Sequence, residues 1–310
     1  MSVADMTSGS RDHSADAAVH AMQRAPRADD EAASAVFNPG RTLPVRVELA
    51  RQLRRRRTQL ALGFMVALPV IIWIAFTVGS DSSSGGSRNS FVDLAKGGAS
   101  NFALVALFFS VSFLLVVVVS LFFGDTVASE ASWSSLRYLL AMPVPRGRLL
   151  RQKVIVAGLL SLVALILLPV TGWIVGALAY GTGPLSTPIG DQFDTGTGLL
   201  RLLLVTGYIA VQLTWVAGLA FLLSVSTDAP LGAVGGAVLL AILSQILDQI
   251  TALGSLRNWL PTHYGLAWTG ALVDPVRRDD MVRGAFAGIA YALVFFALAV
   301  IRFHRKDVTS

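Results

Sequence analysis

The chain has 310 residues, of which 54% are apolar and only 14% are charged, and its mean hydropathy is +0.64. Soluble domains carry about 25% charged residues, so this composition excludes an ordinary soluble domain and favours a protein that has the lipid bilayer as its solvent. The net charge is +6, but the basic residues lie beside apolar runs rather than among aromatic residues, which predicts no nucleic-acid partner. The chain has no cysteine, which excludes disulfide and thiolate chemistry.

The N-terminal region divides into two parts. Residues 1–40 are rich in Ala, Asp, Ser and Arg without apolar periodicity, so we expect a disordered tail. The segment 41–57 is predicted to form an amphipathic juxtamembrane helix, because Val45, Leu49 and Leu53 recur every four residues and arginines fill the rest. Such a helix would lie along the membrane with its basic face on anionic lipid headgroups. It is either a positively charged anchor alone or a helix that also contacts a partner.

Six apolar runs are each long enough to cross the hydrocarbon core, which takes about 20 helical residues. The predicted fold is therefore an all-α integral membrane protein with six transmembrane helices. They form a six-span transmembrane domain over 58–302, followed by a short tail at 303–310. We expect the six spans near 58–79, 102–123, 154–180, 199–223, 229–250 and 282–302.

Basic residues are unevenly divided between the segments that join the spans. They crowd 41–57, 124–153 and the C-terminal tail, whereas 181–198 has none and 80–101 has only Arg88 and Lys96. The positive-inside rule therefore predicts a multi-pass protein of the cytoplasmic membrane with both termini and the 124–153 segment in the cytoplasm. The segment 251–281, on the outer side, is half apolar and is expected to lie at the membrane interface or to dip back into it.

The segment 124–153 has the most informative pattern in the chain. Asp125 and Glu130 come first and are expected near the start of a helix, where acids suit the helix dipole. Leucines supply an apolar face, Pro143 and a second proline then break the helix, and basic residues lead into the third span. The pattern predicts two cytoplasmic helices joined by a proline-fixed turn, which suits the docking of another protein. The alternative is an ordinary positively charged loop.

This segment resembles a motif of ATP-binding-cassette permeases of the type-2 exporter class, E-x-x-x-G-T-L-R-x-L-L-x-x-P-x-x-R. The residues that carry the resemblance are Glu130, Ser134, Ser135, Leu136, Arg137, Leu139, Leu140, Pro143, Arg146 and Lys153. Ser134 and Ser135 stand where the family has glycine and threonine. The resemblance covers the chain from about residue 40 to its end, including the six spans.

The resemblance implies the partners of the chain. In that family this loop is a coupling helix that contacts a nucleotide-binding ATPase subunit, and the amphipathic N-terminal helix lies beside it. A second permease copy or a paralogue would complete the transport pathway. The docking residues implied on this chain are Glu130, Ser135, Arg137, Pro143 and Arg146.

Several kinds of catalytic site lack their sequence motifs in this chain. There is no G-x-x-x-x-G-K-[ST] segment, so ATP and Mg²⁺ are expected on the partner subunit and no cofactor is expected here. The four histidines are scattered, and neither H-E-x-x-H nor G-x-S-x-G occurs. We therefore expect no catalytic or metal site, and His263 is expected to shape the outer loop.

Polar residues inside the spans form a second candidate site, because they are costly in lipid and often functional. Gln245 and Gln249 lie one turn apart in the fifth span, and Gln212 and Thr214 lie in the fourth. They either line a substrate path or form hydrogen bonds between helices. Asp248, near the outer end of the fifth span, is the plausible intramembrane group for ion coupling.

The leading hypothesis is a permease subunit of an ABC exporter, which moves a substrate across the cytoplasmic membrane by ATP hydrolysis on a separate subunit. The chain would thus be a transporter subunit rather than an enzyme. One alternative is an ion-coupled secondary transporter, which would need more intramembrane ionisable groups and inverted repeats. Another is a non-transporting membrane scaffold, which also needs only a docking loop.

Overall fold

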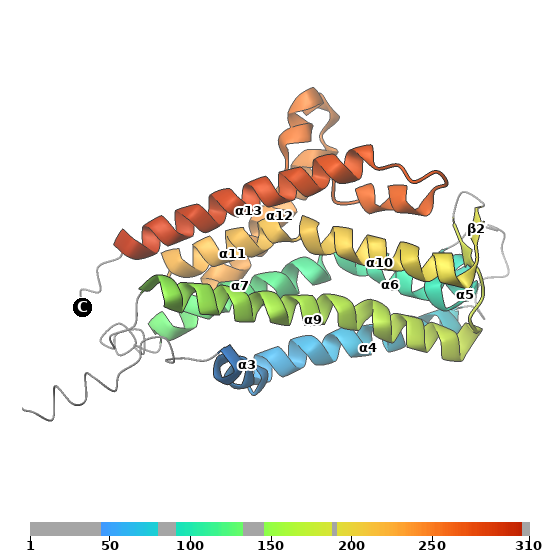
Figure 1. Ribbon diagram of the computed structural model, residues 1–310, viewed down its shortest axis with the longest axis horizontal. Coiled ribbons are helices and arrows are strands. Elements are labelled where there is room, and N and C mark those ends of the chain that lie inside the picture. The colour runs from blue at the N-terminus through green and yellow to red at the C-terminus, as the bar shows by residue number, and fades with distance from the viewer. Residues whose placement is uncertain (1–44, 80–90, 133–145, 188–190, 306–310) are drawn as a thin grey trace, which may run out of the picture. The chain divides into compact units, whose positions relative to one another are not determined.

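The computed structural model describes residues 45–79, 91–132, 146–187 and 191–305. The predicted disordered tail, 1–40, lies outside them. The described residues belong to one compact unit that begins at Val45. In chain order its elements are α3 (Val45–Leu53), α4 (Arg56–Gly79), α5 (Phe91–Lys96), α6 (Ala99–Val111), α7 (Leu114–Ser132), α9 (Arg146–Tyr180), β1 (Leu185–Ser186), β2 (Gln192–Phe193), α10 (Thr195–Gln212), α11 (Thr214–Ser226), α12 (Pro230–Gln249), η2 (Thr251–Trp259), η3 (Ala267–Leu272) and α13 (Asp279–Arg305) (Figure 1).

The helices are long and apolar enough to cross a membrane several times. Among the described residues, α4, α9, α12, α13 and the continuous stretch Thr195–Ser226 each qualify as a candidate span. The bent pair α6 and α7 brings the number from five to six if it forms one span. This confirms an all-α multi-pass membrane protein. The described residues also include a two-stranded antiparallel hairpin, β1 with β2.

The second predicted span, 102–123, is not one straight helix. α6 and α7 meet at a bend of 60° around Ser112 and Phe113. The sequence did not reveal this bend, because apolar Val, Leu and Phe residues continue on both sides of it and neither proline nor glycine marks the position. α10 and α11 adjoin at Leu213, which keeps helical dihedral angles, and so they continue as one stretch.

The predicted helix 41–57 is shorter than expected and faces the bundle differently. α3 ends at Leu53, and α4 begins at Arg56, so the last two arginines of the run belong to the first span. Val47 is 60% exposed and Leu53 is 40% exposed, whereas Gln52 is buried. The side of α3 that faces the bundle therefore carries polar as well as apolar residues, since Gln52 is buried and Val45, Glu48 and Leu49 are partly buried.

The predicted loop 124–153 is largely helical at both of its stems. α7 continues to Ser132 and α9 begins at Arg146, which leaves 133–145 as the segment between them. Likewise, α13 continues three residues into the predicted tail, to Arg305. Figure 1 shows α3, the beginning of α9 and the end of α13 toward one end of the bundle. The hairpin β1–β2 lies at the opposite end.

Close helix packing holds the bundle together. α7 packs against α9, α11 and α12, and α11 packs against α13. At Gly176 of α9 an added Cβ would lie 2.9 Å from the Cα of Ala99 and 2.8 Å from the Cβ of Phe102, so only glycine permits this approach to α6. Such contacts matter in lipid, where van der Waals packing replaces hydrophobic burial as the force between helices. α7 therefore lies at the centre of the packing, with both candidate sites along it.

Candidate functional site

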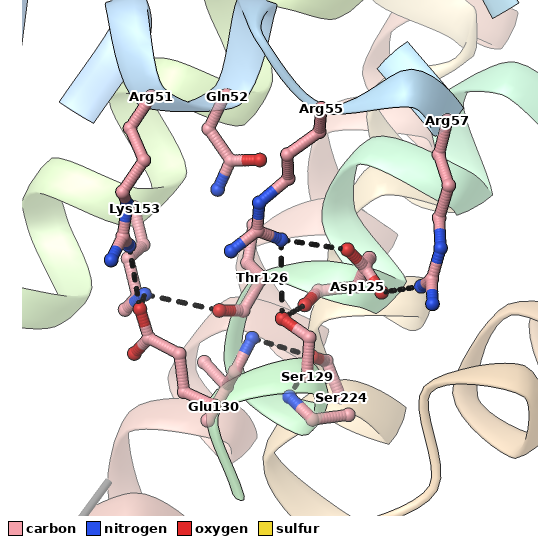
Figure 2. Close-up of polar contacts among 12 residues, drawn as sticks. Arg51, Gln52, Arg55, Arg57, Asp125, Thr126, Ser129, Glu130, Lys153 and Ser224 are labelled. Carbon is pink, nitrogen blue, oxygen red and sulfur yellow. Dashed lines mark hydrogen bonds and ion pairs between the residues drawn. The ribbon is translucent and has the colours of Figure 1, made fainter. Parts of the chain in front are cut away.

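A cluster of charged side chains lies where α3, the start of α4, the last turns of α7 and the first turns of α9 meet (Figure 2). Among the described residues it joins four basic and three acidic side chains, Arg51, Arg55, Arg57, Lys153, Glu48, Asp125 and Glu130. We call this set the ionic cluster. Because α7 and α9 are the two stems of the 133–145 segment, the ionic cluster lies at the base of the segment that was predicted to dock a partner.

The ion pair between Lys153 and Glu130 is the most buried contact of the cluster. Lys153 Nζ lies 2.6 Å from Glu130 Oε1, and both side chains are only 4% exposed. Lys153 Nζ also donates to the backbone oxygen of Thr126 at 3.0 Å. Arg51 Nη2 reaches the same Glu130 oxygen at 2.7 Å. Glu130 thus ties α7 to α9 and to α3 at one point.

Asp125 fixes the entry to the first span. Arg55 Nη1 lies 3.0 Å from Asp125 Oδ2, and Arg57 Nη1 lies 2.7 Å from Asp125 Oδ1. Arg55 also donates to Ser129 Oγ at 3.4 Å (Figure 2). Arg55, just before α4, and Arg57, in the first turn of α4, therefore both bind the Asp125 carboxylate of α7.

The position of the two acids on their helix differs from the prediction. Asp125 and Glu130 lie in the last turns of α7, not near the start of a helix. Negative charge at a helix C-terminus opposes the helix dipole, so the acids need the surrounding cations. The boundary was wrong because the apolar span and the polar segment form one continuous helix, which a change in composition alone does not reveal.

Glu48 extends the ionic cluster onto α3. Its Oε1 accepts hydrogen bonds from Arg51 at 2.8 Å and from Gln52 at 3.1 Å. Burial by itself raises the pKa of the Glu48 carboxyl, but the hydrogen bond from Arg51 and the charges of Lys153 and Arg51 outweigh it. The pKa of Glu48 is therefore held below its ordinary value of 4.5.

We expect the attachment of α3 to weaken in acid. A carboxyl whose pKa is lowered by folding contributes stability above its unfolded-state pKa, and the contribution is lost as the pH falls through the folded-state pKa. The melting temperature of the purified protein should be followed from about pH 7 down to about pH 3, below the ordinary carboxyl range. Over the acid part of this range, the melting temperature of Glu48→Gln should fall by less than that of the wild type. Equal losses in both proteins would contradict this role of Glu48.

A second polar site lies beside the bend between α6 and α7. A cavity of about 160 Å³ is lined by side chains of α6, α7, α10, α11, α12 and the segment 262–266. Gln212, Gln245 and Gln249 line it, as residues of a substrate path would. Thr214 is not among its described lining residues, and its hydroxyl donates to the backbone oxygen of Val211 instead.

The glutamines of this site also hold separate elements together. Gln245 Nε2 donates to the backbone oxygen of Ser112, in the bend between α6 and α7, at 2.7 Å. Gln212 Nε2 donates to the backbone oxygen of Pro261 at 2.7 Å. The same residues therefore line a cavity and make the hydrogen bonds between segments that the sequence left as an alternative.

Asp248 makes contacts that the sequence did not reveal. Its Oδ1 lies 2.6 Å from Nδ1 of His263 and 3.5 Å from Nε of Arg257. These contacts join the last turn of α12 to η2 and to the segment after it. Since His263 belongs to a loop without regular periodicity, its pairing with Asp248 had no sequence signal beyond the presence of an acid near a span end. Within the described residues, no group of three His, Cys, Asp or Glu side chains could hold a metal ion.

The predicted docking residues are only partly described. Glu130 is described, and it lies at the centre of the ionic cluster. Ser135, Arg137 and Pro143 lie outside the described residues, and Arg146 is the first residue of α9 with its side chain also outside them. Sequence reasoning did not identify Arg51 and Lys153 as partners of Glu130. It also did not identify Arg55 and Arg57 as partners of Asp125. The signal that could have found them is the presence of opposite charges near neighbouring span ends.

Comparison with known proteins gives one family. Residues 70–309 match the family model DUF2705, described as a protein of unknown function. No curated protein matches the chain. The matched segment contains both helices that flank 133–145 and the lining of the cavity, whereas α3 and the arginines up to Arg57 precede it. Because the match covers more than half of the sequence, the chain belongs to the DUF2705 family.

Proposed function

We propose that the chain is the membrane-spanning permease subunit of an ABC exporter in the cytoplasmic membrane, with both termini on the cytoplasmic side. A separate ATPase subunit would dock on 133–145 and would bind ATP and Mg²⁺. A second permease copy or a paralogue would complete the pathway. The observation that carries this proposal is the ionic cluster, which binds both stems of the 133–145 segment to each other and to α3.

The ionic cluster fixes α7 and α9, the two helices that flank 133–145, relative to each other. Lys153 and Glu130 form their 2.6 Å contact near the two ends of 133–145, and both are almost fully buried. Breaking such a buried pair costs about 3–5 kcal/mol. If a docked partner displaced the segment, α7 and α9 would therefore move together, because the buried ion pair holds them to each other.

α7 connects the ionic cluster to the cavity. It has 19 residues, which corresponds to a length of about 28 Å at 1.5 Å per residue. One end carries Glu130, and the other end meets the 60° bend at Ser112 and Phe113, where the cavity begins. A tilt of α7 driven at the ionic cluster would change the shape of the cavity, which is what coupling ATP hydrolysis to transport requires.

The arginines of the ionic cluster, together with Arg56, offer a surface for acidic groups. An open cavity of about 710 Å³ is lined by Arg51, Arg55, Arg56 and Arg57 together with acids and a serine of α7. Acidic side chains of the ATPase subunit would fit this charge. Anionic lipid headgroups would fit the arginines that remain exposed to the membrane surface.

A second candidate function is ion-coupled transport, and one observation favours it. The contact of 2.6 Å between Asp248 and His263 is a carboxylate–imidazole pair that could carry a proton. Transport that stops when the membrane is made permeable to protons, while ATP remains present, would select this function over ATP-driven export.

Affinity purification in mild detergent tests the leading proposal. We expect the wild-type chain to bring down a nucleotide-binding subunit with ATPase activity. The double variant Arg137→Glu with Arg146→Glu should lower the activity in the eluate by about tenfold or more, the effect of losing about 1.4 kcal/mol of docking free energy. Arg277→Glu with Arg278→Glu makes the same change of charge in the segment between η3 and α13 and should leave the activity unchanged. An eluate without ATPase, or equal activity in all three samples, would overturn the proposal.

A further inference from the structure

The cavity beside the bend has the volume of a small-ligand site, and part of its lining is apolar. Its volume is about 160 Å³, close to that of an engineered apolar cavity of about 150 Å³ that binds benzene. It therefore has room for one six-membered ring. The apolar wall is formed by Val111, Val116, Ile209, Leu213, Trp215, Val216 and Leu266.

Much of the polar lining comes from the end of α12 and from the segment after η2. Gln245 and Asp248 come from the last turns of α12, and Thr262 and His263 come from the segment after η2. Non-helical backbone and ionisable side chains at membrane depth are costly, and they are found where they line a cavity or take part in binding. Ser112, in the bend between α6 and α7, and Leu213, at the junction of α10 and α11, both line this cavity.

The charge of the lining selects the kind of ligand. Asp248 is the one acid among the described lining residues, and no lysine or arginine is among them. The contacts of Asp248 with His263 and Arg257 both run to Oδ1, and its Oδ2 makes no hydrogen bond among the described residues. The Arg257 separation of 3.5 Å is long for a hydrogen bond. The carboxylate therefore keeps an acceptor for a cation.

We propose that this cavity binds the protonated amine end of a small amphipathic molecule. The ammonium group donates to Asp248, and the attached ring or chain lies against the apolar wall. That the bound molecule is a transported substrate rests on the proposed function. Binding itself needs no ATPase, so a negative result for binding would leave the co-purification experiment to decide the proposed function separately.

Three probes of one size and different charge test the proposal. Benzylamine is cationic at neutral pH, benzyl alcohol is neutral and benzoate is anionic. Saturation-transfer NMR on the full-length protein in detergent should show benzylamine bound more tightly than benzyl alcohol, and no binding of benzoate. Asp248→Asn should weaken the binding of benzylamine by about tenfold or more, because a charge-assisted hydrogen bond is lost. The affinity of the same variant for benzyl alcohol should stay within about twofold of the wild-type affinity, since this probe makes no ionic contact.

Two further variants locate the site. Asp279→Asn removes an exposed acid from the first turn of α13 and should leave all three probes unchanged. Val116→Phe fills the cavity from α7 without touching the carboxylate and should abolish binding of both benzylamine and benzyl alcohol. If Asp248→Asn does not fold, Val116→Phe decides. The proposal is overturned if wild type binds no benzylamine, if benzoate binds as tightly, or if benzylamine binding survives in a folded Val116→Phe variant.

Discussion

Replacing Lys153 with methionine should destabilise the protein more than any other single substitution in the ionic cluster. The change leaves Glu130 as a carboxylate that is 4% exposed without its buried cation, and it removes the donor to the backbone oxygen of Thr126. Arg51 still reaches Glu130, but its own side chain is 48% exposed and faces water. Breaking a buried ion pair on one side costs about 3–5 kcal/mol, and chemical unfolding in detergent micelles would measure it.

Two variants make this measurement specific to the pair. Glu130→Gln combined with Lys153→Met removes both charges and should be less destabilised than Lys153→Met alone, because no carboxylate remains buried without its partner. Arg151→Met changes an exposed cation two positions earlier on α9 and should cost no more than about 0.5 kcal/mol. The pair has no special role in stability if Lys153→Met costs as little as Arg151→Met.

Gly284→Ala should loosen the segment that closes the cavity. Tyr208 of α10 donates a hydrogen bond to the backbone oxygen of Tyr264 at 2.7 Å, which holds this segment against the bundle. A Cβ at Gly284 of α13 would overlap the Tyr208 hydroxyl and would lie 2.5 Å from the Cβ of Tyr264. Inserting a methyl group into a packed site costs about 1–3 kcal/mol, and the tight fit on two sides places this case toward the upper end.

A double-mutant cycle tests that mechanism. Tyr208→Phe removes the hydroxyl that the new methyl group would strike, so Gly284→Ala with Tyr208→Phe should be less destabilised than the sum of the two single variants. Gly207→Ala is the matched control, because nothing lies within 4 Å of an added Cβ there. Strictly additive losses of melting temperature would show that Gly284 and Tyr208 do not share this contact.

The apolar spans could be predicted from the sequence because their signal is local. Every apolar run of about 20 residues corresponds to a helix or a helix pair in the structure. The bend at Ser112 and Phe113 could not be predicted in this way, since no local helix breaker marks it and the side chain that bonds its backbone, Gln245, comes from another helix. The burial of Gln52 on α3 could not be predicted for a similar reason, because its neighbours come from α7 and α9, which lie far away in the sequence.

The two candidate sites differ in how much the sequence could show. The three glutamines that line the cavity could be identified from the sequence, because polar side chains inside an apolar span are costly in lipid and are often functional. Thr214 does not join them, since its hydroxyl is satisfied three residues back, as helical threonines commonly are. The contacts of α3 and α4 with α7 in the ionic cluster could not be predicted, because Arg51 and Arg55 are separated from their partners by 79 and 70 residues along the chain. Glu130 and Lys153 were recognised through their places in a motif and Asp125 through its place beside the second span, but not as members of one cluster.

The docking of an ATPase on 133–145 can be measured by cross-linking from a single position. The natural chain has no cysteine, so Ser135→Cys can carry a photoactivatable cross-linker in native membranes. We predict that it captures a polypeptide that an azido-ATP probe also labels, and that Arg137→Glu with Arg146→Glu removes this product. A cross-linker at Ser255→Cys, exposed in η2, should capture no such polypeptide. If no ATP-binding polypeptide is captured from position 135, or if position 255 captures it equally, the proposed permease function is contradicted.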